Sequence, residues 1–300
     1  MLTTQQIRRI ADQSGARDIE KVETDIILTH LLQLFHDKGI TRYIAFKGGT
    51  MLRKMIFGPR GRYSTDLDFT LRSDFTDEQV MDMILDALRE PYHGITFRIA
   101  DKDWDFTGGS FFANPTCSHA GNEKGVKINI QVSLREKPIL PARALPQIQQ
   151  GYFKELPFSP ADIPCLAHEE VMSEKIRAAS QRSKIRDLHD LSQAVNIRFD
   201  RDLTRSLAVI KLWESDKENL DYNHFTKQIE DGKDYDLNEL KNLLRKDEQP
   251  DLKVMIRRVT ENYRWLGQAT DLERSITQDS KRTRKAEVAA LKAQAVKRAG

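Results

Sequence analysis

Residues 46–70 read FKGGTMLRKMIFGPRGRYSTDLDFT, with a Gly-Gly-Thr turn near one end and an Asp-Leu-Asp pair near the other. A short apolar run before the turn predicts a buried strand, and the turn opens a helix that the GPRG segment of residues 58–61 ends. Residues 63–71 alternate, so one face of a second strand carries Asp66 and Asp68 while the other is apolar. The stretch therefore predicts a strand, a glycine turn, a helix and an acidic strand.

The acidic pair has the spacing of a metal site. Two carboxylates at positions i and i+2 of a strand point to the same side, with Cα atoms roughly 6–7 Å apart, which is close enough to share a divalent cation. Without a cation the two acids repel each other, which raises the pKa of one of them. The alternative is a solvated polar face on an edge strand, which is the commoner explanation for an isolated pair.

The two glycines suggest what such a cation would bind. Between a strand and a helix, the backbone of Gly48 and Gly49 can approach a phosphate and aim its N–H groups at it, and Thr50 adds a hydroxyl. A glycine pair alone usually marks only a turn. The combined pattern predicts more, namely a turn that binds a polyphosphate beside acids that hold the bridging metal.

The segments FKGGTMLRKM and RYSTDLDF resemble the AbiEii family of nucleotidyltransferase toxins, found in bacterial abortive-infection and toxin–antitoxin systems. Its wider superfamily, which includes DNA polymerase beta, has a GG[ST] turn followed by a DxD strand. The predicted amphipathic helix over residues 18–37 is similar to the opening of that family. A second resemblance lies in residues 169–191, EEVMSEKIRAASQRSKIRDLHDL, which match an EK motif followed by RDxxD. Taken alone, this segment also fits an exposed charged helix with i, i+4 ion pairs.

The resemblance implies transfer of a nucleoside monophosphate from an NTP, with Mg²⁺ or Mn²⁺ as cofactor and release of pyrophosphate. It implies a nucleic-acid acceptor, with tRNA 3′ ends as first choice, a block of translation and growth, and a cognate antitoxin as partner. Asp187 would organise Lys175 or Arg186. The other roles carried over are metal binding by Asp66 and Asp68, triphosphate binding by Gly48, Gly49, Thr50 and Ser64, and charge neutralisation by Lys175.

One feature departs from the superfamily, whose members usually carry a third carboxylate on a later strand. The matching segment here, residues 126–134, offers Asn129 and Gln131 instead. Either Asp187 substitutes for the missing acid, or the acceptor needs no strong base. Two other functions therefore stay open: nucleotidylation of a protein hydroxyl, and a nucleotide-binding module without turnover.

The fold class expected is α+β. The resemblance implies a nucleotidyltransferase domain over residues 1–160, with a mixed sheet of about five strands. The proline-rich segment of residues 136–164 reads as a connector, and beyond it the sequence is almost wholly helical. A helical domain is therefore predicted over residues 161–300, carrying the EKxR and RDxxD motifs and a basic tail.

The composition predicts a soluble cytoplasmic protein. At 300 residues and 39% apolar content the chain can bury a sizeable core, and no apolar run is long enough for a membrane span or a secretory signal. Cys117 and Cys165 match no metal or redox spacing. The last 20 residues carry a net charge of +6, against +3 for the whole chain. Such a tail fits either phosphate backbones or a solvated helix face.

Overall fold

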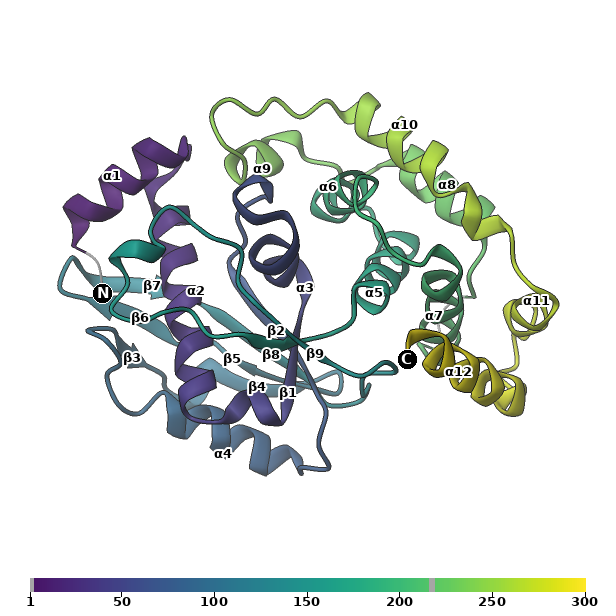
Figure 1. Ribbon diagram of the computed structural model, residues 1–300, viewed down its shortest axis with the longest axis horizontal. Helices are drawn as coiled ribbons and strands as arrows, with labels where there is room; N and C mark the ends of the chain where they lie inside the picture. The colour runs from purple at the N-terminus through teal and green to yellow at the C-terminus, as the bar shows by residue number, and fades with distance from the viewer. Residues whose placement is uncertain (1–2, 216–218) are drawn as a thin grey trace. The chain divides into compact units, whose positions relative to one another are not determined.

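A seven-stranded mixed sheet forms the centre of the first of two units in the chain (Figure 1). The computed structural model describes residues 3–215 and 219–300. Unit 1 comprises Met1–Pro138, Ala142–Leu166 and Asn242–Glu248, and unit 2 comprises Ile139–Pro141, Ala167–Lys241 and Gln249–Gly300. Each unit is therefore assembled from segments that are separated in the sequence.

The seven strands of the sheet follow the order β4-β5-β8-β2-β1-β10-β9. Their bounds are β1 Ile44–Lys47, β2 Asp66–Leu71, β4 Trp104–Thr107, β5 Ser110–Ala113, β8 Asn129–Ser133, β9 Arg143–Leu145 and β10 Ile163–Cys165. A second, three-stranded sheet contains β3 Thr96–Arg98, β6 Thr116–His119 and β7 Asn122–Lys127. Strands β1 and β2, which flank the glycine turn, lie side by side near the middle of the large sheet.

The α+β prediction is confirmed, but the sheet has more strands than the expected five or so. Strands β9 and β10 have three residues each and lie in the proline-rich connector, where no alternating pattern shows them. Strand β3 pairs with β6 in the small sheet and is not part of the large one. Pairing with neighbours, which the local sequence does not reveal, determines these assignments.

Helix α2 (Ile19–Asp37) lies across the large sheet and packs on β2, where the rings of Phe35 and Phe69 are 5.8 Å apart (Figure 1). Asp18 caps its first turn by accepting a hydrogen bond from the backbone of Glu20 at 2.9 Å. The sequence predicts an amphipathic helix, yet every residue from Thr24 to Phe35 is buried. The polar residues of this stretch therefore need partners inside the protein.

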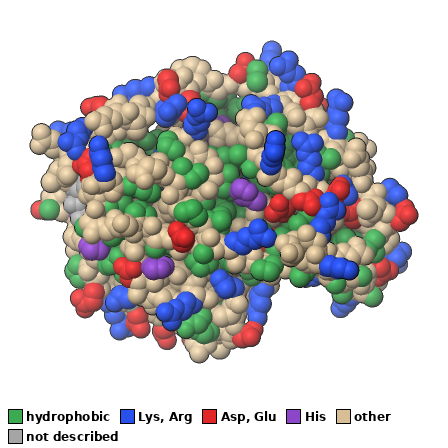
Figure 2. Space-filling model, in the orientation of Figure 1, with side chains coloured by type: hydrophobic (Ala, Val, Ile, Leu, Met, Phe, Trp, Pro, Cys, Tyr) green, Lys and Arg blue, Asp and Glu red, His purple; other side chains and the backbone are tan. Residues whose placement is uncertain are grey.

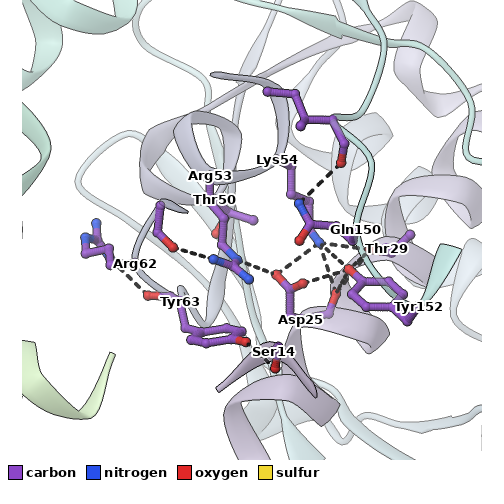
Figure 3. Close-up of polar contacts among 12 residues, drawn as sticks. Ser14, Asp25, Thr29, Thr50, Arg53, Lys54, Arg62, Tyr63, Gln150 and Tyr152 are labelled. Atoms are coloured by element: carbon purple, nitrogen blue, oxygen red, sulfur yellow. Dashed lines mark hydrogen bonds and ion pairs between the residues drawn. The ribbon is translucent and has the colours of Figure 1, made fainter. Parts of the chain in front are cut away.

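Asp25 of α2 finds its partners in the helix that follows the glycine turn (Figure 3). Its Oδ1 accepts hydrogen bonds from Arg53 Nε at 3.0 Å and Lys54 Nζ at 3.2 Å, and its Oδ2 accepts one from the hydroxyl of Tyr152 at 2.7 Å. Burial alone would raise the pKa of Asp25, but the charges of Arg53 and Lys54 outweigh it and hold the pKa far below its usual value. This charged cluster fastens three distant segments together.

The segment after the turn is not a regular α-helix. Helix α3 covers only Gly48–Met51, and Leu52–Phe57 continues as a π-helix before a 3₁₀ turn over Gly58–Arg60. Such π-helical turns are rare and often occur at functional sites. Here the wider turn contains both of the cations that contact Asp25.

Two further helices belong to unit 1, α1 (Thr4–Ser14) and α4 (Asp77–Ala87).

Residues 242–248 follow helices of unit 2 in the sequence but belong to unit 1. The backbone of Tyr63 donates to the carbonyl of Leu243 at 2.8 Å, and that of Lys246 donates to the carbonyl of Gly15 at 2.7 Å. Leu243 also joins an apolar cluster with residues of α1 and α2.

Unit 2 is a helical assembly in which α5 packs against α6, α7 and α8, and α12 packs against α7. The helices are α5 His168–Gln181, α6 Ile185–Ala194, α7 Arg201–Glu214, α8 Tyr222–Asp231, α9 Leu237–Asn242, α10 Leu252–Asn262, α11 Asp271–Thr277 and α12 Lys285–Ala299. None of the helices in the described residues is long and apolar enough to cross a lipid bilayer.

The basic C-terminal tail forms α12, and part of its charge is paired within unit 2. Lys292 contacts Glu214 at 2.6 Å, and Arg298 contacts Asp200 at 2.5 Å. Basic and acidic side chains lie close together on the visible face of the protein (Figure 2). These ion pairs favour the second of the two explanations for the tail, a solvated helix face.

Replacing Asp25 should destabilise the protein strongly. The Asp25→Ala variant leaves Arg53 and Lys54 buried without their carboxylate, so we expect its free energy of unfolding to fall by about 3–5 kcal/mol. Urea unfolding followed by circular dichroism measures the change. Arg9→Ala is the control, because Arg9 forms a half-exposed pair with Glu155 and should cost less than about 1 kcal/mol. Equal losses in the two variants would contradict the role given to the cluster.

Candidate active site

The strand order places the acidic pair between β1 and β8. In the antiparallel pairing of β1 and β2, Lys47 lies opposite Asp68. Leu67 and Phe69 are fully buried, whereas Asp66 and Asp68 are half-buried on the other face of β2. The alternation in the sequence thus brings both carboxylates to the face and end of the sheet from which the glycine turn leaves β1.

Gly48 lies directly against the carboxylate of Asp68. Its φ of +80° falls in the left-handed region that glycine tolerates best. A Cβ atom at this position would lie 2.1 Å from Asp68 Oδ2 and 2.9 Å from Asp68 Cβ, so no larger residue fits without moving the acid. The turn and the acidic strand, 20 residues apart in the sequence, therefore converge at one place.

Gly49 has an equally close neighbour, the guanidinium of Arg62. A Cβ on Gly49 would lie 2.4 Å from Arg62 Nη2 and 3.3 Å from its Cζ. The next residue, Thr50, is fully buried, and its hydroxyl donates to the backbone carbonyl of Asp66 at 2.5 Å. A carboxylate and a guanidinium thus flank the two glycines, while Thr50 ties the turn to the first residue of β2.

The loop before β2 is held in place by Arg53 (Figure 3). The guanidinium of Arg53 donates to the carbonyl of Gly61 and lies over the ring of Tyr63, 4.0 Å from its centroid. Ser64, two residues before Asp66, is buried in the same loop, with 6% of its surface exposed. The charged cluster at Asp25 therefore also fixes the loop that contains Arg62 and Ser64.

The position of the missing third acid is occupied by amides, as the sequence indicates. Strand β8 runs parallel to β2 with Asn129 in register with Asp66, and Gln131 in register with Asp68. Asn129 donates to Asn114 at 3.0 Å, and Gln131 donates to the hydroxyl of Ser110 at 3.2 Å. Both side chains are thus engaged with β5 or the residue that follows it.

A divalent cation fits the acidic pair. Among the described residues, no group of three or more His, Cys, Asp or Glu side chains is placed to hold a metal ion. Mg²⁺ commonly needs only one or two carboxylates, because water and substrate phosphates supply its other oxygen ligands. Asp66 and Asp68, half-buried on one strand face, match that requirement.

The second motif forms a buried ion cluster within unit 2. Lys175 of α5 lies between Asp187 and Asp190 of α6, at 3.0 Å and 2.8 Å. The other oxygen of Asp187 accepts a hydrogen bond from Arg182 Nε at 2.9 Å. Burial would raise the pKa of Asp187, but Lys175 and Arg182 reverse the effect and lower it.

The structure brings some of the sequence-predicted residues of this motif together and adds one that sequence reasoning missed. Asp187 contacts Lys175, whereas Arg186 pairs with Glu239 at 3.0 Å. Asp190, the last acid of RDLHD, was not singled out although it is 2% exposed and contacts Lys175. Its spacing of three from Asp187 on one helix was the signal that could have identified it.

Glu170 and Glu174, in and just before the EK motif, stabilise the fold of unit 2. Glu170 is fully buried and accepts hydrogen bonds from the backbones of Ile139 and Leu140, both at 2.9 Å. Lys211 of α7 contacts Glu170 at 3.0 Å and Glu174 at 3.1 Å. The segment is therefore not an exposed charged helix, because Glu170, Lys175 and Asp187 are paired in the interior.

Removing Lys175 should destabilise the protein at neutral pH more than in acid. In Lys175→Met the buried acids lose a cation, and we expect a loss of about 3 kcal/mol in the free energy of unfolding at pH 7. A carboxylate with a lowered pKa stabilises the fold above its unfolded pKa of about 3.9, and this stability is lost as the pH falls through its lower folded pKa. The gap between variant and wild type should therefore narrow in urea titrations below about pH 4. Lys253→Met, on the exposed face of α10, should show no such gap at either pH.

Comparison with solved structures finds the same fold in MenT4, a nucleotidyltransferase toxin from Mycobacterium tuberculosis H37Rv. The two chains are 23% identical, the alignment covers 99% of this chain and 100% of that one, and the TM-score is 0.83. A putative nucleotidyltransferase from H. pylori is more distant, at 17% identity, 81% and 94% coverage and a TM-score of 0.49. No curated protein matches the chain.

A family model gives the decisive comparison. The model described as nucleotidyl transferase AbiEii toxin, type IV toxin–antitoxin system, matches residues 30–273. This range covers most of the chain and includes the glycine turn, the acidic strand and the Lys175 cluster. The chain therefore belongs to the AbiEii family of nucleotidyltransferase toxins.

Proposed function

We propose that this nucleotidyltransferase transfers a nucleoside monophosphate from an NTP to the 3′ end of tRNA, with Mg²⁺ or Mn²⁺ as cofactor. The modified tRNA would no longer support translation, and growth would stop until a cognate antitoxin neutralises the enzyme in the cytoplasm. The contact between the Gly48 backbone and the Asp68 carboxylate carries the proposal, because it joins the predicted phosphate turn to the predicted metal ligands.

Each residue of the first motif has a distinct part in this proposal. Asp66 and Asp68 hold the metal, which when bound would neutralise phosphate charge. The backbones of Gly48 and Gly49 approach the triphosphate, and Ser64 lies in the loop beside them. Since the Thr50 hydroxyl donates to Asp66, its contribution is to keep the turn at a fixed distance from β2. Positioning of this kind supplies most of the catalysis in phosphoryl transfer.

In this proposal the second motif supplies a positive charge for the phosphates and an acid that orients it. Lys175 contacts Asp187 at 3.0 Å and Asp190 at 2.8 Å, and we keep it as the predicted partner of the phosphates. Asp187 orients Lys175 through their direct contact. A strong base for the acceptor hydroxyl is not essential, because the transition state of such transfers is loose and needs little help from proton abstraction.

One observation favours a second candidate, a nucleotide-binding protein without turnover. The amides Asn129 and Gln131 occupy the register positions beside the two acids, where a third carboxylate would activate an acceptor. Binding of NTP without transfer would then be the whole activity. The same experiment separates both candidates from a third outcome, nucleotidylation of a protein hydroxyl.

The test incubates purified protein with each α-³²P-labelled NTP, Mg²⁺ or Mn²⁺, and total tRNA. Label on tRNA supports the proposal, label on protein supports the protein acceptor, and NTP binding without label transfer supports the second candidate. Asp66→Asn and Asp68→Asn should each reduce transfer at least 1,000-fold, about 4 kcal/mol, while leaving circular dichroism unchanged.

Asp74→Asn is the matched control for these two variants. Asp74 lies just beyond β2, and its side chain is 94% exposed. Its loss should leave transfer at the wild-type rate. Transfer that persists in Asp66→Asn or Asp68→Asn would show that the acidic pair does not hold the catalytic metal.

A further inference from the structure

We propose that Arg62 is a polyphosphate-binding residue of unit 1, which contacts the phosphates of the NTP at the glycine turn. This inference rests on the proposed function and adds to it a residue to which the resemblance gave no role. It starts from the contact at Gly49, where the missing side chain leaves room for a guanidinium rather than for solvent.

The position of Arg62 is the first support. All three atoms nearest to a Cβ built on Gly49 belong to the Arg62 guanidinium, at 2.4, 3.3 and 3.6 Å. Arg62 is also buried, with 5% of its surface exposed. A phosphate that approaches the backbone of Gly49 would therefore meet this guanidinium at contact distance.

The rigidity of the loop is the second support. Gly61 is held by Arg53, and the backbone of Tyr63 is held by Leu243, so both neighbours of Arg62 are fixed. Arg53 is held in turn by Asp25. In Figure 3 the Arg62 side chain extends away from this cluster, and its Nη1 donates to the carbonyl of Tyr63 at 3.4 Å. A side chain held in this way loses little entropy when it binds a ligand.

The charge of the guanidinium is the third support. A nucleoside triphosphate with one bound divalent cation still carries negative charge. Arg62 provides a cation beside the turn, and a planar guanidinium binds two phosphate oxygens at once.

The direct test measures binding of inorganic tripolyphosphate and of a non-hydrolysable NTP analogue by calorimetry, with Mg²⁺ present. We expect Arg62→Gln to weaken both affinities at least tenfold, because it removes a charge-assisted hydrogen bond to phosphate. Arg62→Lys keeps the buried charge but cannot bind two phosphate oxygens at once. Its affinity for each ligand should therefore lie between that of the wild type and that of Arg62→Gln. The KM for NTP in the transfer assay should rise in the same order.

Arg60→Gln is the matched control, since Arg60 is an exposed arginine in the same loop. It should bind tripolyphosphate as the wild type does, and thermal melts confirm that each variant is folded. If Arg62→Gln does not fold, Arg62→Lys alone decides the question. Tripolyphosphate affinity equal to wild type in a folded Arg62→Gln or Arg62→Lys variant overturns the inference.

A double-mutant cycle with Gly49→Ala probes the contact itself. The added methyl group would displace the guanidinium, so Gly49→Ala should weaken tripolyphosphate binding in the wild type but have much less effect in an Arg62→Ala background. Full additivity would refute a shared role for the two residues.

The outcomes for Arg62 and for the proposed function can be separated. Tripolyphosphate binding that depends on Arg62, in a wild-type protein that transfers no nucleotide, supports the arginine and refutes the transfer. Transfer by the wild type, together with an unchanged KM for NTP in a folded Arg62→Gln variant, supports the transfer and refutes the role of Arg62.

Discussion

The buried contact of Asp25 with Arg53 and Lys54 is the interaction on which the rest of unit 1 depends. A carboxylate in the middle of α2 is costly to bury, and so are two adjacent cations; together they are tolerable because their charges and hydrogen bonds are satisfied. The π-helical turn places both cations on the side facing α2. Through Arg53 the same contact reaches Gly61 and Tyr63, so a structural charge cluster sets the position of the loop next to the acidic strand.

The two motifs use charge in different ways. In unit 2 the Lys175 cluster is nearly closed, with two carboxylates and an arginine around one lysine. In unit 1 the acids at the glycine turn are half-buried, and the proposed function assigns them a metal ion. A buried ion cluster of this kind gives rigidity to the helices that it joins.

The sequence was informative where a pattern was local. Alternation predicted the buried and polar faces of β2, and the glycine turn and the two acids, which the sequence predicts as one site, converge in the fold. The short strands β9 and β10 could not be predicted, because their pairing partners lie far away along the chain. The burial of Asp25 could not be predicted for a similar reason. Its buried partners are 28 and 29 residues away, and an acid on an amphipathic helix is expected on the solvent-facing side.

The burial of Arg62 also could not be predicted from its sequence neighbours. Within GPRGRYSTD, Arg60 is exposed and Arg62 is buried, and no hydrophobic periodicity in this loop predicts that difference. The difference comes from the tertiary contact with Gly49. Asp190 differs from both, since its spacing of three from Asp187 places the two acids on the same side of α6.

The return of residues 242–248 to the sheet-containing unit constrains how the polypeptide can be divided. A truncated product that stops at Leu166 would lack Leu243, so the amide of Tyr63 would lose its acceptor and the apolar cluster of α1 and α2 would be opened to water. The ribosome must therefore have synthesised most of the protein before the N-terminal half can be completed. A chain released before residue 243 would lack this contact to the loop beside the acidic strand.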